Sequence, residues 1–180
     1  MRKAKTHIAF IFIVLTLIFT VSCSQKGYSS WHLNELNIDK LWEYSKGSSQ
    51  VIAFIDTGIS PDFRNSCADR IIFEYSVIDD SENVLDLHGH GTEMISVACN
   101  SDYKDVYGIA PESKIIVIKA VSDEGKTNNN YLYKALVVAE EQGATIVNIS
   151  LGGYKHSDKV EDQIAGMIDK GISIVAAAGD

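Results

Sequence analysis

Five apolar runs rich in β-branched residues recur along this chain, and no other feature limits its possible folds as strongly. Most of them are continuous rather than alternating, which is the pattern of strands buried on both faces of a sheet. The runs are Val51–Ile55, Ile71–Val77, Ile115–Val121, Thr145–Ile149 and Ile172–Ala176. We therefore predict a sheet of mostly parallel strands that is covered on both sides.

Helical patterns lie between the later runs. Apolar residues recur at i, i+3, i+4 and i+7 over Leu132–Ala139, ahead of Gly143, and a similar spacing marks residues 160–168. Ser157 stands where the second helix needs an N-cap, and Gly171 stands where it needs a C-terminal stop. Strands that alternate with helices predict an α/β fold with a parallel sheet between two helical layers. In such a sheet, ligands bind at the carboxyl ends of the strands.

Polar residues follow several of these runs at the point where a strand would end. Asp56 follows the first run, Ser150 follows the fourth, and the last run continues into Asp180. His90 stands before Gly91 and a short apolar helical pattern. In an Asp-His-Ser triad, an aspartate fixes the tautomer of an imidazole that accepts a proton from the nucleophile. Asp56 and His90 are therefore candidate catalytic residues.

Each of these pieces has another interpretation. The sequence Asp56-Thr57-Gly58 also occurs in ordinary turns and is the signature of aspartic proteases. His88 and His90 could be two metal ligands, but no third ligand stands at a suitable spacing, and His88 fits a loop residue better than a ligand. Ser150 could simply end a strand in a tight turn. Taken singly, none of these pieces decides the function.

The order and spacing of the pieces together resemble the subtilase family, the subtilisin-like serine proteases. The resemblance extends from Trp31 to Asp180. It is carried by five blocks, namely VIAFIDTGISPDF around Asp56, HGHGTEMIS around His90, YGIAPESKIIVIKAV, GKTNN and VNISLGG. Because an aspartic protease predicts none of the later blocks, that alternative is set aside.

The resemblance implies a three-layer subtilisin-like fold and the activity of a serine endopeptidase. His90, the histidine followed by Gly-Thr, would be the general base, and Asp56 would orient it. A peptide or protein substrate would pair as an added strand with two edge segments. These segments are Ser150-Leu151-Gly152 and Gly125-Lys126-Thr127.

The resemblance implies no cofactor. Members of the family bind calcium, and Asp62 is the best single candidate for such a role here. The loop Asn100–Asp105 matches too loosely to define a site, so no metal site is predicted. The chain is expected to be a monomer.

The chain departs from the family pattern at four places. Glu93 replaces a second histidine, and Asp180 replaces the asparagine that donates to the oxyanion. A carboxyl group at that position can donate only when it is protonated, which requires a strongly raised pKa. Only residues 24–50 separate the signal from the first predicted strand, which is too few for a folding pro-domain. Finally, no Gly-Thr-Ser block supplies the nucleophilic serine.

These departures lead to an expectation and two alternatives. We expect the N-terminal part of a subtilase, with residues 24–50 as an N-terminal segment and residues 51–180 as a partial peptidase domain. Its sheet would be incomplete on the C-terminal side, and the 180 residues alone would be inactive. The first alternative is a non-catalytic, surface-attached protein that binds peptides. The second is a site completed by another polypeptide that supplies the serine.

Residues 1–23 have the pattern of an export signal. Three basic residues precede an apolar run, Ile8–Val21, which as a helix would rise about 21 Å at ~1.5 Å per residue. This length is short for a hydrocarbon core of about 30 Å, so a signal peptide is favoured over a permanent span. Cys23 after Ser22 resembles a lipoprotein signal, in which the cysteine is lipidated, whereas ordinary cleavage after Ser24 is the alternative. The mature protein is expected to be secreted or lipid-anchored on the extracytoplasmic face of a bacterial membrane.

Charge and cysteine content limit the partners further. Without the basic residues Arg2, Lys3 and Lys5, 13 of the 16 Lys and Arg remain against 24 Asp and Glu, a net charge of −11. Such a chain repels phosphate backbones and anionic headgroups, so nucleic acid is excluded as a partner and a membrane is contacted only through the signal or lipid. Cys67 and Cys99 would be exported together and could form a disulfide, but the sequence does not decide whether they meet.

Overall fold

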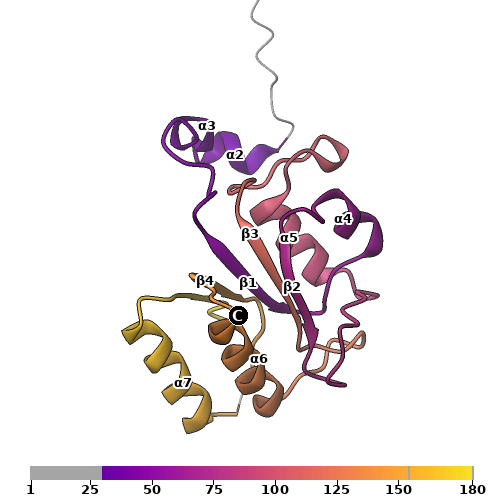
Figure 1. The fold of residues 1–180 in the computed structure, drawn as a ribbon, viewed down its shortest axis with the longest axis vertical. Helices are drawn as coiled ribbons and strands as arrows, with labels where there is room; N and C mark the ends of the chain where they lie inside the picture. Colours follow the sequence, from indigo (N-terminus) through magenta and orange to yellow (C-terminus); the bar gives the residue numbers. More distant parts are fainter. Residues whose placement is uncertain (1–29, 154, 180) are drawn as a thin grey trace, which may run out of the picture.

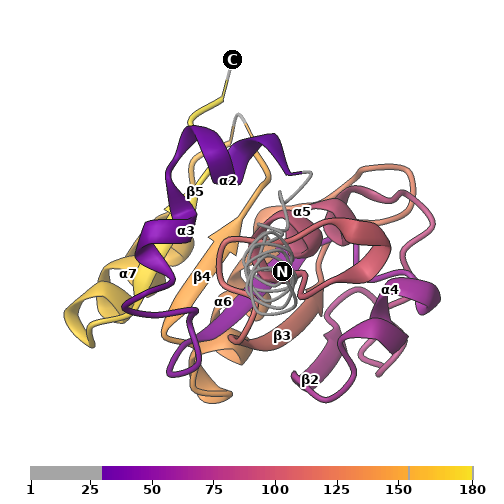
Figure 2. The same ribbon diagram turned by 90° about the horizontal axis from the view of Figure 1, so that it is seen from above.

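One parallel sheet organises the molecule. The computed structural model describes residues 30–153 and 155–179, and in it five strands pair in the order β2-β3-β1-β4-β5 (Figure 1). The strands are β1 (Val51–Asp56), β2 (Ile71–Ser76), β3 (Lys114–Lys119), β4 (Ile146–Ile149) and β5 (Ser173–Ala176). Every neighbouring pair is parallel. Figure 2 shows β2 and β5 at opposite edges of the sheet. The predicted α/β fold with a parallel sheet is confirmed.

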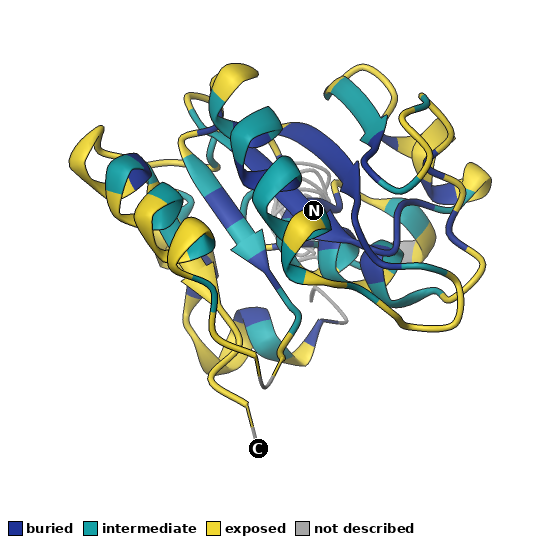
Figure 3. Ribbon diagram, turned by 90° about the horizontal axis from the view of Figure 1, so that it is seen from below, coloured by how far each residue is buried: buried dark blue, intermediate teal, exposed yellow. Residues whose placement is uncertain are grey.

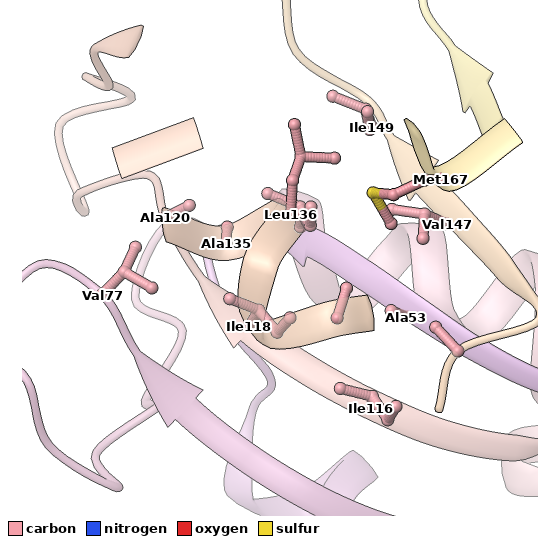
Figure 4. Close-up of a cluster of buried hydrophobic side chains, with 13 residues drawn as sticks. Ala53, Val77, Ile116, Ile118, Ala120, Ala135, Leu136, Val147, Ile149 and Met167 are labelled. Carbon is pink, nitrogen blue, oxygen red and sulfur yellow. The ribbon is translucent and has the colours of Figure 1, made fainter. Parts of the chain in front are cut away.

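Helices cover both faces of the sheet. Side chains alternate between the two faces along β1, and those on each face are apolar and need to be buried. Ala53 and Ile55 face the helices α6 (Asn129–Glu141) and α7 (Asp158–Asp169) in a cluster that includes Leu136 and Met167 (Figure 4). Ile52 and Phe54 face the opposite layer, which consists of α4 (Pro61–Ser66) and α5 (His90–Cys99). Burial of one such large side chain contributes about 1.5–3 kcal/mol, so the two clusters fix all three layers.

The helix ends partly follow the sequence signals. Asn128, which the sequence analysis did not single out, caps α6 by accepting from the backbone N–H groups of Asn130 and Tyr131 at 2.9 and 3.0 Å. Ser157 is the N-cap residue of α7, as predicted, although its side chain makes no capping hydrogen bond. Gly171 follows α7 with a φ of 85°, the left-handed conformation in which glycine ends a helix at little cost.

The segment before β1 packs at the end of the sheet where β1 and β3 begin (Figure 1). It contains α2 (Trp31–Glu35) and α3 (Ile38–Leu41). The indole Nε1 of Trp42 donates to the backbone oxygen of Ile109 at 2.8 Å, and the ring Nε2 of His32 lies 3.1 Å from the backbone oxygen of Tyr107. These contacts attach the segment to the loop between η1 (Tyr103–Asp105) and β3, far from the carboxyl ends of the strands.

The β5 edge is more exposed than the centre of the sheet. Val175 of β5 is 55% exposed and Ile168 of α7 is 54% exposed, whereas β1 and β3 are almost entirely buried. Figure 3 shows this gradient from the buried central strands to the exposed C-terminal end. Apolar surface therefore reaches solvent at the C-terminal side of the described sheet.

Among residues 30–153 and 155–179, the structure contains no helix with the length and apolar character needed to span a membrane.

Candidate active site

Asp56 and His90 meet at the carboxyl end of β1. Asp56 is the last residue of β1 and is only 2% exposed. Its Oδ1 accepts from the backbone N–H of Thr57 at 2.7 Å and lies 2.7 Å from Nδ1 of the His90 ring. Because a carboxylate accepts, Nδ1 carries the proton, and Nε2 is left as the basic nitrogen. The two predicted catalytic residues, 34 positions apart in the chain, are thus in direct contact.

Close backbone packing brings the start of α5 to this position. His90 is the first residue of α5, and Gly89 before it has a φ of 95°. Gly91 lies against the turn after β1 so closely that a Cβ there would be 2.4 Å from the backbone oxygen of Gly58. A glycine is therefore required for the helix to reach Asp56.

The second oxygen of Asp56 has a different environment. Oδ2 is buried and accepts no hydrogen bond from the described part of the chain. A buried acceptor without a donor is rare in proteins, and a catalytic role is one of the explanations for it.

The sequence analysis did not single out two residues that the structure places beside Asp56 and His90. Asp86 is 6% exposed and accepts hydrogen bonds around the start of α5. Lys119 ends β3 beside Asp56, and its ammonium donates to the backbone oxygens of Thr57 and Leu85 and to Asp123. The one available signal for Asp86 was its place four residues before His90, at the entry to a helix.

The two predicted substrate edges border one hollow. Thr127 lines it on one side, and Leu151 and Gly152 line it on the other. Its volume is about 1020 Å³, and its apolar lining comes mainly from Leu132, Leu151, Val160 and Ile164. The structure thus brings Thr127 to the same cavity as the segment after β4.

The remaining residues of the predicted edges, Gly125, Lys126 and Ser150, are not among those that line this hollow. Gly125, with a φ of 73°, is in a turn in which the backbone N–H of Ser122 donates to the oxygen of Lys126 at 2.9 Å. The hydroxyl of Ser150 accepts from the side-chain amide of Asn148 at 2.8 Å. Gly125 also lies next to the ring of His88, which places this turn close to the start of α5.

Comparison with known proteins decides the family. The model of the subtilase family matches residues 47–180, which include β1, α5 and every strand of the sheet. The chain belongs to the subtilase family.

Relatives of this subtilase are considerably longer than the chain. It is 32% identical over 146 residues to a thermophilic serine proteinase of Bacillus sp. strain AK1, covering 79% of this chain and 36% of the relative. It is 24% identical to thermitase of Thermoactinomyces vulgaris, covering 81% of this chain and 53% of thermitase. It is 30% identical to the minor extracellular protease Epr of Bacillus subtilis, covering 86% of this chain and 24% of Epr. The chain therefore spans about half or less of the length of these relatives.

A solved structure supports the same fold. The crystal structure of a cold-adapted subtilisin-like serine proteinase matches with a TM-score of 0.62, at 24% identity, over 76% of this chain and 49% of that one. The subtilisin-like arrangement predicted from the blocks around Asp56 and His90 is thus confirmed at the level of the fold.

Other predicted features of this subtilase have mixed outcomes. Asp180 and Cys23 lie outside the described residues. His88 is a loop residue whose ring stands edge-on to His90 with centroids 6.2 Å apart, and the described residues hold no cluster of three His, Cys, Asp or Glu suited to a metal. Cys67 and Cys99 are buried in the same cluster and are both free thiols.

Proposed function

We propose that this subtilase chain carries the acid–base part of a serine endopeptidase site. The 2.7 Å contact between Asp56 and Nδ1 of His90 carries the proposal, since it directs Nε2 away from the carboxylate and toward a nucleophile. In this mechanism His90 takes the proton of the attacking serine and returns it to the leaving amine. Asp56 holds the ring and stabilises its charged form without taking the proton itself.

The substrate of the proposed enzyme is an extended peptide. It would lie between Gly125-Lys126-Thr127 and Ser150-Leu151-Gly152 and exchange backbone hydrogen bonds with them, as an added strand does. The apolar hollow between these segments supports the proposal, because it could receive an apolar side chain of that peptide.

The serine of the triad is not assigned to this chain. Its sequence has no Gly-Thr-Ser block, and within the described residues the His90 ring hydrogen-bonds only to Asp56. We therefore propose that the 180 residues alone do not hydrolyse peptides. A continuation of the polypeptide, or another chain, would supply the serine, and Asp180 would then stand at the oxyanion position.

Export completes the proposal. Residues 1–23 would act as the signal, with Cys23 as the candidate for lipidation, and the protein would work outside the cytoplasm as a monomer. No cofactor is proposed, and nucleic acid is not a proposed partner.

A fluorophosphonate probe and a peptide substrate test this function. We expect no labelling of the 180-residue chain. A gene product that continues to a Gly-Thr-Ser block should be labelled and should hydrolyse peptides. In it, Asp56→Asn should lower kcat by about 10⁴-fold and His90→Ala by about 10⁶-fold. Asp69→Asn, at an exposed position, is the matched control for the loss of one carboxylate. Unchanged rates in both site variants would refute the assignment.

A second candidate function is peptide binding without catalysis. It is favoured because the hollow and the two edge segments lie within the described residues, whereas the His90 ring has no hydroxyl partner among them. Calorimetry with apolar peptides should then detect binding to the 180-residue chain, and Ile164→Asp in the hollow should weaken it. Val97→Asp, on the far layer, should leave it unchanged.

A further inference from the structure

We infer that Asp86 is a positioning residue, which holds the start of α5 against the turn after β1 and so sets the contact between His90 and Asp56. This inference rests on the proposed function, because the contact matters for catalysis only if His90 is the base. Asp86 accepts five hydrogen bonds, from two threonine hydroxyls and three backbone N–H groups.

The two threonines form a reciprocal connection through Asp86. Thr57, directly after Asp56, donates its hydroxyl to Oδ1 of Asp86 at 2.9 Å and accepts from the backbone N–H of Gly91 at 2.8 Å. Thr92, in α5, donates its hydroxyl to Oδ2 at 2.6 Å and accepts from the backbone N–H of Ser60 at 2.9 Å. Each hydroxyl thus bonds both to Asp86 and to the backbone of the opposite element.

The direction of these bonds depends on the carboxylate. A hydroxyl has one proton, so a threonine that donates to Asp86 must present its lone pairs to a backbone N–H. Without an acceptor at residue 86, both hydroxyls lose the partner that orients them. The bonds from Thr57 to Gly91 and from Thr92 to Ser60 would then weaken together.

The three backbone bonds show that Asp86 also closes the entry to α5. It accepts from the N–H groups of His88, Gly89 and Thr92 at 3.1, 2.7 and 2.9 Å. A carboxylate at a helix N-terminus satisfies groups that have no partner inside the helix. These bonds alone describe a cap, whereas the threonine bonds connect the cap to the residue after Asp56. That connection predicts an effect on the His90–Asp56 geometry beyond an effect on helix stability.

Proton NMR of the 180-residue chain tests this role directly. A proton shared between Nδ1 and a buried carboxylate gives a resolved low-field imidazole resonance that exchanges slowly with water. In Asp86→Asn we expect this resonance to exchange at least about tenfold faster or to disappear, while the far-UV circular dichroism spectrum is retained. Asp69→Asn is the control and should leave both observations unchanged.

A second pair of variants keeps the test informative if Asp86→Asn does not fold. Thr57→Val removes the bridging hydroxyl, and Thr57→Ser retains it, so only the first should accelerate the exchange. An unchanged resonance in both Asp86→Asn and Thr57→Val would overturn the positioning role and leave the proposed function intact. A wild-type chain without the resonance would overturn the Asp56–His90 contact, and both proposals with it.

Discussion

Nζ of Lys119 donates a 2.7 Å hydrogen bond to the backbone oxygen of Thr57, the residue that follows Asp56. The same ammonium donates to the oxygen of Leu85 at 2.8 Å and to Oδ1 of Asp123 at 2.6 Å. One nearly buried cation thus joins the turn after β1 to the segment that leads to Asp86 and α5. The walls of the site are held together by backbone oxygens as well as by side chains.

Replacing Lys119 by Met should therefore destabilise the fold. The variant keeps the length of the side chain but leaves two backbone oxygens without a donor, and we expect a loss of about 2–3 kcal/mol in the free energy of unfolding. Lys114→Met, at the exposed first residue of the same strand, should change it by no more than about 0.5 kcal/mol. Urea unfolding measures both, and equal effects would contradict the role of the ammonium.

The sheet could be predicted from the sequence because strands that are buried on both faces consist of continuous apolar runs. The predicted runs miss the strand ends by a residue or two, and the largest excess is in the run Ile115–Val121, which extends two residues past the end of β3 at Lys119. The N–H groups of Ala120 and Val121 both turn toward the oxygen of Asp56 at 2.9 and 3.1 Å instead of continuing the strand. A run of apolar residues indicates which segment is buried, but it does not indicate where the strand ends and the backbone turns.

The site was predictable only where it depends on residue order. Asp56 and His90 stand in blocks whose types and spacing resemble a known family. Asp86 and Lys119 bond mostly to backbone N–H and C=O groups or to common hydroxyls, which every sequence contains. Their roles arise from segments up to 62 positions apart and emerge only when the chain is folded.

Two glycine substitutions in helices should have opposite effects. Gly91→Ala would place a Cβ 2.4 Å from the backbone oxygen of Gly58, so α5 must move away from β1. We expect a loss of at least about 2 kcal/mol in unfolding free energy and a weaker Asp56–His90 contact. Gly166→Ala in α7 meets nothing within 4 Å and should stabilise the chain by about 0.5–1 kcal/mol. Thermal unfolding of the two variants measures the contrast, and a neutral Gly91→Ala would contradict the close approach.

Cys67 and Cys99, the free cysteines among the described residues, should resist alkylation in the folded chain. Burial raises the pKa of the Cys67 thiol, and it raises that of Cys99 to about 11. At pH 8 a thiol with that pKa is ionised about 200-fold less than an ordinary one, and only the thiolate reacts. Iodoacetamide followed by peptide mass spectrometry should label both residues in urea and neither in buffer. Rapid labelling of Cys99 in the folded chain would show that its cluster opens easily.

The carboxyl of Asp86 should make stability dependent on acid. Burial raises its pKa, but hydrogen bonds from the Thr92 hydroxyl and from the backbone N–H groups of Gly89 and Thr92 outweigh burial and hold the pKa below its ordinary value. A group whose pKa is lower in the folded state contributes fully to the stability of the fold above its unfolded pKa, about 3.9 for Asp, and loses that contribution as the pH falls through the folded pKa.

The difference in unfolding free energy between wild type and Asp86→Asn should therefore be constant from pH 7 to 5 and shrink below about pH 4. Urea titrations at each pH measure this difference, with Asp69→Asn as the reference for an exposed carboxylate. A difference that stays constant down to pH 3 would mean that Asp86 acts through its shape and not through its charge.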